Sequence, residues 1–304
     1  MIGVFGSSGF IGRNFVDFLN EREIEFMRFQ RTDDGLWRSN TRIGSFGDRS
    51  SYEPYLDRLE TAVLLVSASV PSTFPNSLHS EVEENVVPYA RFLDSIGGSS
   101  LKKLIFLSSG GAVYGAPNQE HIDEQHQTMP ISNYGVGKLM IENAICASAF
   151  RADWNYSILR VSNPVGKFQG TKKRQGIVAA AIDAAFTKRH LEVWGDGSAL
   201  RDYIHVRDVC SAILAASKTK ACVDQIYNVG SGEAVSVTQI IEYCREILKI
   251  DLQTNHSPDR DFLVKDILLD SSKFRGDTNW SPSYTVKEAI SDTIEHYKTV
   301  QKSK

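Results

Sequence analysis

The stretch GVFGSSGFIGRNFVDFL, residues 3–19, constrains the fold of this 304-residue chain more than any other. Residues 2–5 have the apolar pattern of a short buried strand, and the apolar residues that follow recur at helical spacing. Gly6, Gly9 and Gly12 lie where the strand becomes the helix. A turn this rich in glycine lets something else come close to the backbone.

Strand-like and helix-like runs alternate as far as residue 166, which is typical of a parallel sheet with helices on both faces. The strand-like runs are residues 2–5, 25–29, 41–46, 62–69, 103–109 and 156–163, and the helical candidates are 52–60, 81–96 and 133–150. We therefore predict a doubly wound α/β fold, with a Rossmann domain over residues 1–166 to which a segment near 202–228 returns. Residues 167–304 should form a smaller substrate-binding lobe over the carboxyl edge of the sheet.

Composition excludes several classes of function. The net charge of -3 and the absence of a long basic run argue against nucleic acid or a membrane surface as a partner. The four cysteines and seven histidines have no metal-ligand spacing, so we expect no metal site and no disulfide scaffold. A strand that begins at residue 2 leaves no room for a signal peptide, and no apolar run reaches the ~18 residues of a spanning helix. A cytoplasmic location is expected.

The glycines form the pattern G-x-x-G-x-x-G between a strand and a helix. In that position a pyrophosphate can approach the backbone and lie at the positive end of the helix dipole. The sequence therefore predicts a nucleotide-binding turn. The residues expected to line it are Gly6, Ser8, Gly9, Phe10, Ile11, Gly12 and Arg13.

The end of the second strand bears on the choice of cofactor. An acidic residue there would hold the ribose hydroxyls of NAD, whereas a basic one would accommodate the 2′-phosphate of NADP. This chain has Gln30 followed by Arg31, and Arg13 stands just after the third glycine. We therefore predict NADP, with NAD as the alternative if both arginines are only solvated surface charges. Asp48 is a candidate for holding the amino group of adenine.

Tyr134 and Lys138 stand four residues apart at the start of the predicted helix 133–150, so one turn of helix separates them. A lysine so placed should lower the pKa of the phenol. The tyrosine could then exchange a proton with a sugar or alcohol oxygen while hydride passes to or from nicotinamide.

With these motifs in order, the chain resembles the extended short-chain dehydrogenase/reductases of the nucleotide-sugar epimerase/dehydratase family over nearly its whole length. The motifs that carry the resemblance are GSSGFIG (6–12), SSGGAVYG (108–115), PISNYGVGK (130–138), RVSNPVG (160–166), GDGSALRDYIHVRDV (195–209) and YNVGSGEAVSV (227–237). The resemblance implies a nucleoside-diphosphate sugar as substrate. It also implies a homodimer formed through the helices at 81–96 and 133–150.

The resemblance also assigns roles to single residues. Tyr134 would be the catalytic acid/base, and Lys138 would orient it and bind the nicotinamide ribose. Asn85 and Ser108 would help line the cofactor site. Asn163, Arg201 and Arg260 would contact the diphosphate of the substrate.

Two positions depart from the family pattern. The catalytic serine or threonine of many relatives corresponds here to Gly110, so Ser109, Ser108 or a water would have to supply the hydroxyl. An aspartate usually follows three residues after the position of Arg260, and this chain has Leu263 there.

The resemblance leaves two reactions at carbon 4 of a hexose. A 4,6-dehydratase needs an acid/base pair where this chain has Gly111 and Ala112, which can transfer no proton. We predict an NADPH-dependent 4-keto-sugar-nucleotide reductase because of Gln30 and Arg31. An NAD-dependent 4-epimerase is the alternative, and a non-catalytic nucleotide-binding regulator on the same fold is a third hypothesis.

Overall fold

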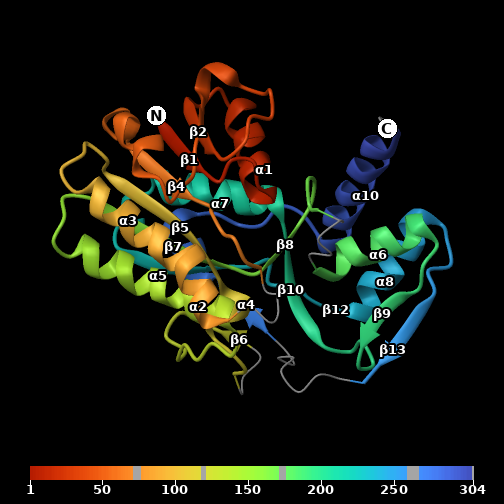
Figure 1. The fold of residues 1–304 in the computed structure, drawn as a ribbon. Helices are drawn as coiled ribbons and strands as arrows, with labels where there is room; N and C mark the ends of the chain where they lie inside the picture. The colour runs from red at the N-terminus through yellow and green to blue at the C-terminus, as the bar shows by residue number, and fades with distance from the viewer. Residues whose placement is uncertain (71–76, 118–120, 171–175, 259–266, 303–304) are drawn as a thin grey trace.

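A parallel seven-stranded sheet forms the centre of the computed structural model, which describes residues 1–70, 77–117, 121–170, 176–258 and 267–302 (Figure 1). The strand order is β11-β7-β5-β4-β1-β2-β3. The strands are β1 (Ile2–Phe5), β2 (Phe26–Gln30), β3 (Thr41–Ile43), β4 (Thr61–Leu64), β5 (Lys103–Ser109), β7 (Asn155–Val161) and β11 (Gln225–Val229). The predicted doubly wound α/β class is confirmed.

Helices cover both faces of the sheet because side chains alternate along each strand. Val4 packs with α1 (Phe10–Asn20) and α7 (Val206–Lys218) in one buried cluster. The neighbouring Phe5 belongs to a second cluster on the other face, where α3 (Val87–Ile96) and α5 (Asn133–Ala149) lie. Each such buried side chain contributes roughly 1.5–3 kcal/mol of transfer free energy.

The predicted helix over 81–96 is divided into three parts. α2 (Leu78–Glu81) leads into a π-helical turn, η4 (Val82–Val86), and α3 follows with Pro88 near its start. Proline has no N–H to donate to the preceding turn, so the α-helical ladder cannot run through it unchanged. Wide turns of this kind are common at functional sites.

Three strands end earlier than predicted, β7 by two residues and β3 and β4 by more, and one strand was not among the strand-like runs. β3 ends at Ile43 and β4 at Leu64, so the residues that follow them form loops at the carboxyl edge of the sheet. β11 adds a seventh strand beside β7, with Gln225 paired to Ser157.

Three small sheets lie outside the central sheet, two of which combine β6 or β8 with strands from later in the chain, and the C-terminal part of the chain has its own buried core. The sheets are β12-β10-β8, β13-β9 and β14-β6, built from β6 (His121–Ile122), β8 (Asn163–Val165), β9 (Leu191–Trp194), β10 (Leu200–His205), β12 (Ala234–Ser236), β13 (Thr254–Ser257) and β14 (Leu268–Leu269). The core lies among α6 (Gly176–Thr187), α8 (Val237–Leu248) and α10 (Val286–Lys302). The remaining helices are α4 (Gly110–Val113), α9 (Ser272–Thr278), η1 (Arg38–Asn40), η2 (Arg49–Ser51), η3 (Glu53–Arg58) and η5 (Lys220–Cys222).

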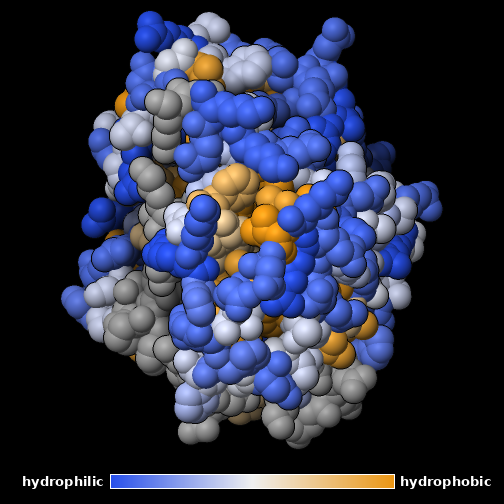
Figure 2. All heavy atoms as spheres, turned by 90° about the vertical axis from the view of Figure 1, so that its right-hand side faces the viewer, coloured by the Kyte–Doolittle hydropathy of each residue, from blue (hydrophilic) through white to orange (hydrophobic). Residues whose placement is uncertain are grey.

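The side of the molecule that carries α6, α8 and α10 is largely hydrophilic, with a hydrophobic area near its centre (Figure 2). Among the exposed large apolar side chains are Phe186 at the end of α6 and Trp194 at the end of β9. Of the helices in the described part of the chain, none combines the length and the apolar character needed to cross a membrane.

Candidate active site

The glycine-rich turn between β1 and α1 leaves no space for side chains at two of its glycines. A Cβ on Gly12 would lie 2.2 Å from the carbonyl oxygen of Gly6, and Gly6 itself has a φ of +83°. Gly9 is exposed at the start of α1, and no side chain of the described residues caps that helix. The first N–H groups of α1 are therefore available to an anion, as the sequence predicts.

The side chain of Gln30, at the end of β2, is buried in a polar network. Its Oε1 accepts hydrogen bonds from Arg28 Nη2 at 2.7 Å and from Ser7 Oγ at 3.0 Å. Arg28 in turn forms an ion pair of 2.5 Å with Asp34, and this contact holds the pKa of Asp34 at about 2. The buried Arg28 that contacts Gln30 is thus already paired with Asp34, so it adds no free positive charge to Arg13 and Arg31, on which the prediction of a 2′-phosphate rests.

The other residues predicted around the adenosine end are exposed. Arg31 is on the surface, and the Arg13 guanidinium lies 5.8 Å from the ring centroid of Phe168. Asp48 accepts hydrogen bonds from the N–H and hydroxyl of Ser50, and so begins the turn η2. The roles predicted for these three residues stay predictions.

The structure brings Tyr134, Ser109 and Lys138 together at the carboxyl end of β5. Ser132 begins α5 by accepting a hydrogen bond from the N–H of Gly135 at 3.1 Å, which places Tyr134 in the first turn. The Ser109 hydroxyl lies near the Tyr134 phenol and acts to lower its pKa. Lys138 Nζ lies 5.7 Å from the centroid of the Tyr134 ring and donates to the carbonyl of Leu107 at 3.0 Å.

Burial controls the proton affinities of this pair. It raises the pKa of Tyr134 to about 12, against the lowering effect of the Ser109 hydrogen bond. It lowers the pKa of Lys138 to about 8. The prediction that the lysine lowers the tyrosine pKa is wrong here, because desolvation of the phenol dominates and the ammonium donates to a backbone carbonyl instead.

Ser108 does not share the surroundings of Ser109. Its hydroxyl donates a short hydrogen bond to the buried carboxylate of Glu142, which also accepts from Arg160 Nη2 at 2.7 Å. Arg160 Nη1 donates to the Tyr114 hydroxyl at 2.9 Å. Because the Ser108 hydroxyl donates its proton to Glu142, it does not donate toward the place of the group missing at Gly110 in this arrangement. Its predicted contact with the cofactor stays a prediction.

The position of the missing hydroxyl is filled from another part of the chain. A Cβ on Gly110 would lie 2.4 Å from Leu269 Cδ1 and 3.2 Å from the carbonyl oxygen of Arg160. A Cβ on Gly111, in contrast, would meet only Asn163 Oδ1, at 3.9 Å. The Leu269 side chain therefore fills the space beside Gly110 at the end of β5, whereas the space beside Gly111 is open.

The predicted substrate-contact residues Asn163 and Arg201 lie on strands of the three-stranded sheet β12-β10-β8. Asn163 is the first residue of β8, and its Nδ2 donates to the Asp202 carbonyl at 2.8 Å. Arg201 lies on β10, which pairs with β8, and its Nη1 donates to the Leu200 carbonyl. Arg260 and Leu263 lie outside the described residues.

Asn85, in the π-helical turn η4, connects that turn by hydrogen bonds to the loop after β4, at the carboxyl edge of the sheet. Its Oδ1 accepts from the N–H of Ala68 at 2.8 Å, and its Nδ2 donates to Ser69 Oγ at 3.1 Å. The same Nδ2 lies 3.0 Å from Glu81 Oε1. A cofactor contact of Asn85 stays a prediction.

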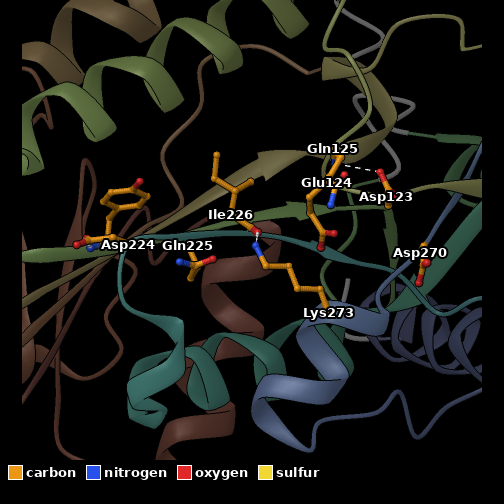
Figure 3. Close-up of a pocket in the computed structure, with 9 residues that line it drawn as sticks. Asp123, Glu124, Gln125, Asp224, Gln225, Ile226, Asp270 and Lys273 are labelled. Atoms are coloured by element: carbon orange, nitrogen blue, oxygen red, sulfur yellow. Dashed lines mark hydrogen bonds between the residues drawn. The ribbon is translucent and has the colours of Figure 1, made fainter.

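A cavity of about 540 Å³ lies away from the predicted site, beside β11 (Figure 3). Its lining includes none of the predicted catalytic, cofactor or substrate residues. The lining residues are Asp123, Glu124, Gln125, Tyr156, Asp224, Gln225, Ile226, Asp270 and Lys273. In this lining, Lys273 Nζ donates to the Ile226 carbonyl at 3.0 Å. Among all the residues that the structure describes, no group of His, Cys, Asp or Glu side chains could hold a metal ion.

Sequence reasoning missed the buried charges around the site. Glu142 and Arg160 are both less than 6% exposed, and Glu81 is 2% exposed. An arginine among the apolar residues of a predicted strand, and a glutamate four residues before Asn85 on a helix, were the available signals. Both patterns indicate a buried charged or polar partner, but neither identifies which residue that partner is.

Comparison with known proteins assigns the family. The model of the NAD dependent epimerase/dehydratase family matches residues 2–230. A putative UDP-glucose 4-epimerase of Methanocaldococcus jannaschii is 28% identical to this chain, and the match covers 97% of both chains. A dTDP-4-dehydro-6-deoxyglucose reductase of Escherichia coli is 24% identical, and the match covers 96% of this chain and 95% of that protein. The crystal structure of UDP-glucose 4-epimerase with UDP-glucose from Thermotoga maritima has a TM-score of 0.91 at 26% identity, covering 99% of both chains. The predicted resemblance is thereby confirmed, and this chain belongs to the NAD dependent epimerase/dehydratase family.

Proposed function

We propose that this enzyme is an NAD-dependent nucleotide-sugar 4-epimerase that acts on UDP-hexoses. The observation that carries the proposal is the grouping of Tyr134, Ser109 and Lys138 at the carboxyl end of β5. Similarity over nearly the whole length to proteins named UDP-glucose 4-epimerase supports this choice over the reductase that Gln30 and Arg31 predicted.

The residues of the glycine-rich turn fit a dinucleotide. Any side chain at Gly12 would fill the space against Gly6, and the first N–H groups of α1 have no side-chain cap among the described residues. Gly6, Gly9 and Gly12 would hold the pyrophosphate, and Lys138 the nicotinamide ribose. Bound NAD would supply the hydride acceptor and donor.

The residues of this chain would manage the proton of the sugar. Tyr134 is the acid/base: its phenolate accepts the proton of the 4-hydroxyl when hydride leaves carbon 4, and returns it when hydride comes back to the other face. Ser109 replaces the hydroxyl that is absent at Gly110. Lys138, one helical turn further along α5, would orient the tyrosine and hold the nicotinamide ribose.

Dehydration is not supported, because Gly111 and Ala112 occupy the acid/base positions that a 4,6-dehydratase needs. A reductase remains a second candidate on two observations. Arg31 is exposed beside a glutamine instead of a carboxylate, and the Escherichia coli relative is named as a 4-dehydro-sugar reductase.

The two candidates differ in what the purified protein contains and consumes. We expect denatured protein to release about one NAD per chain, and the native protein to interconvert UDP-glucose and UDP-galactose without added reductant. Mass spectrometry of the released nicotinamide and chromatography of the sugar nucleotides measure both. An empty site that prefers NADPH, with NADPH consumed on a 4-keto-sugar nucleotide, would support the reductase and contradict the epimerase.

A homodimer through α3 and α5 is also proposed, because large apolar side chains are exposed at and after α5. Met140 on α5 is 40% exposed and Phe150 is 90% exposed. We expect light scattering at micromolar concentration to give twice the chain mass of 33.9 kDa. The variant Met140→Glu should shift the protein to monomer, whereas Val300→Glu, at an exposed valine of α10, should not. Only monomer in the unaltered protein would contradict the proposal.

A further inference from the structure

Glu81 is a buried carboxylate that the proposed mechanism does not use. It ends α2, just before the π-helical turn, and it is 2% exposed. Its Oε1 accepts from Asn85 Nδ2 at 3.0 Å. Its Oε2 is buried without a hydrogen-bond partner among the described residues, and the ion pairs found there do not include Glu81. A buried carboxylate with an unpartnered oxygen costs stability, so its position calls for a reason.

The carboxylate lies against the turn of α5 that carries the catalytic pair. A Cβ on Gly137 would be 2.5 Å from Glu81 Oε1 and 2.7 Å from its Cγ. Gly137 stands between Tyr134 and Lys138, so only a glycine there lets the carboxylate approach the helix backbone. Two glycines of the motif Y-G-V-G-K thus have separate packing reasons, because a Cβ on Gly135 would instead lie 2.5 Å from the Ala112 carbonyl oxygen.

Other ionisable groups face the pair from the surrounding elements. These are Glu81 of α2, Tyr89 of α3 and Glu142 of α5. Glu142 is already paired with Arg160, and Tyr89 donates its hydroxyl proton to the Val66 carbonyl at 2.8 Å. Glu81 is therefore the carboxylate in this set that no cation within ion-pair distance neutralises.

Building on the proposed function, we propose that Glu81 is a positioning residue whose buried charge, held against Gly137, keeps the Lys138 ammonium protonated and makes the Tyr134 phenolate a stronger base. The effect of its charge is in the expected direction for both groups, since it raises the pKa of Lys138 and of Tyr134. Asn85 couples this carboxylate to the loop after β4 through Ala68. The residue would act through Tyr134 and Lys138, and no part of the proposed mechanism assigns it to substrate or cofactor binding.

Removing the charge tests the proposal without relying on activity. The NMR signal of the Lys138 side-chain carbon next to the ammonium should titrate near pH 8 in the unaltered, isotope-labelled protein. The signal is assigned by its absence from the spectrum of Lys138→Arg. In Glu81→Gln the midpoint should fall by about one pH unit. Glu84→Gln is the matched control, because Glu84 is exposed on the same helical segment and solvent screens its charge. Equal midpoints in Glu81→Gln and the unaltered protein would overturn the proposal.

Folding and function are kept separate by two further measurements. If Glu81→Gln lowers the melting temperature too far for titration, Gly137→Ala should displace the carboxylate and move the Lys138 midpoint in the same direction; an unmoved midpoint there would count against the proposal. In epimerase assays of Glu81→Gln, the alkaline limb of kcat should move to lower pH with little change in KM. A shifted midpoint in a protein without epimerase activity would overturn the proposed function and leave the role of Glu81 standing.

Discussion

Tyr134→Phe should lower the rate of sugar-nucleotide interconversion by about 10²- to 10⁴-fold, the usual contribution of a positioned acid/base. Phenylalanine fills the same space in the first turn of α5 but has no proton to exchange with the sugar. The variant should therefore fold, and it should still release its nicotinamide cofactor on denaturation. Steady-state assays with both UDP-hexoses, beside thermal melting, measure the two effects separately.

Tyr52→Phe provides the matched control, since it also removes a buried phenol. The Tyr52 hydroxyl is hydrogen-bonded to Ser95 at 3.2 Å in the aromatic core on the α3 face. Its loss should cost about 1 kcal/mol of stability and leave the rate unchanged. Full activity in Tyr134→Phe would contradict its catalytic role, and a chain inactive in every assay before and after the change would favour the non-catalytic regulator.

Arg160→Met should lower the free energy of unfolding by roughly 3–5 kcal/mol, because it leaves the carboxylate of Glu142 buried and uncompensated. Arg160 donates to both oxygens of Glu142, at 3.2, 3.2 and 2.7 Å, and neither side chain is more than 6% exposed. Urea denaturation followed by circular dichroism measures the loss.

The double variant Arg160→Met/Glu142→Met separates the cost of an unpaired charge from the value of the pair. Both charges vanish together, so much of the lost stability should return. If the single variant loses less than about 1 kcal/mol, the carboxylate must find another partner on its own, and the network from Ser108 to Tyr114 would not depend on Arg160.

The sequence predicted the parts of the site that depend on local geometry. Four residues make one helical turn, so Tyr134 and Lys138 had to share a face of α5. The glycine pattern between β1 and α1 likewise predicted a tight turn with accessible backbone, and the structure adds the reason for Gly12, where a Cβ would meet the Gly6 carbonyl oxygen. Both predictions needed only the spacing of residues close together in the chain.

Distant contacts could not be predicted in the same way. Ser108 and Ser109 alternate across β5, and only the packed sheet decides which of them meets Glu142 and which meets Tyr134. The closure of Gly110 comes from Leu269, far along the chain. The pKa of Tyr134 was predicted in the wrong direction because the spacing of two residues contains no information on how deeply they are buried.

The position of β11 beside β7 has a consequence for the synthesis of the chain. β7 ends at Val161, but the strand that completes its hydrogen bonding begins at Gln225. At about 5–20 residues per second, translation of the intervening segment takes several seconds, during which one edge of β7 has no neighbouring strand from its own chain. An unpaired edge of this kind can template association with another chain. A ribosome that stalls between these two strands would therefore hold a nascent chain in which this edge of β7 is open to association with another chain.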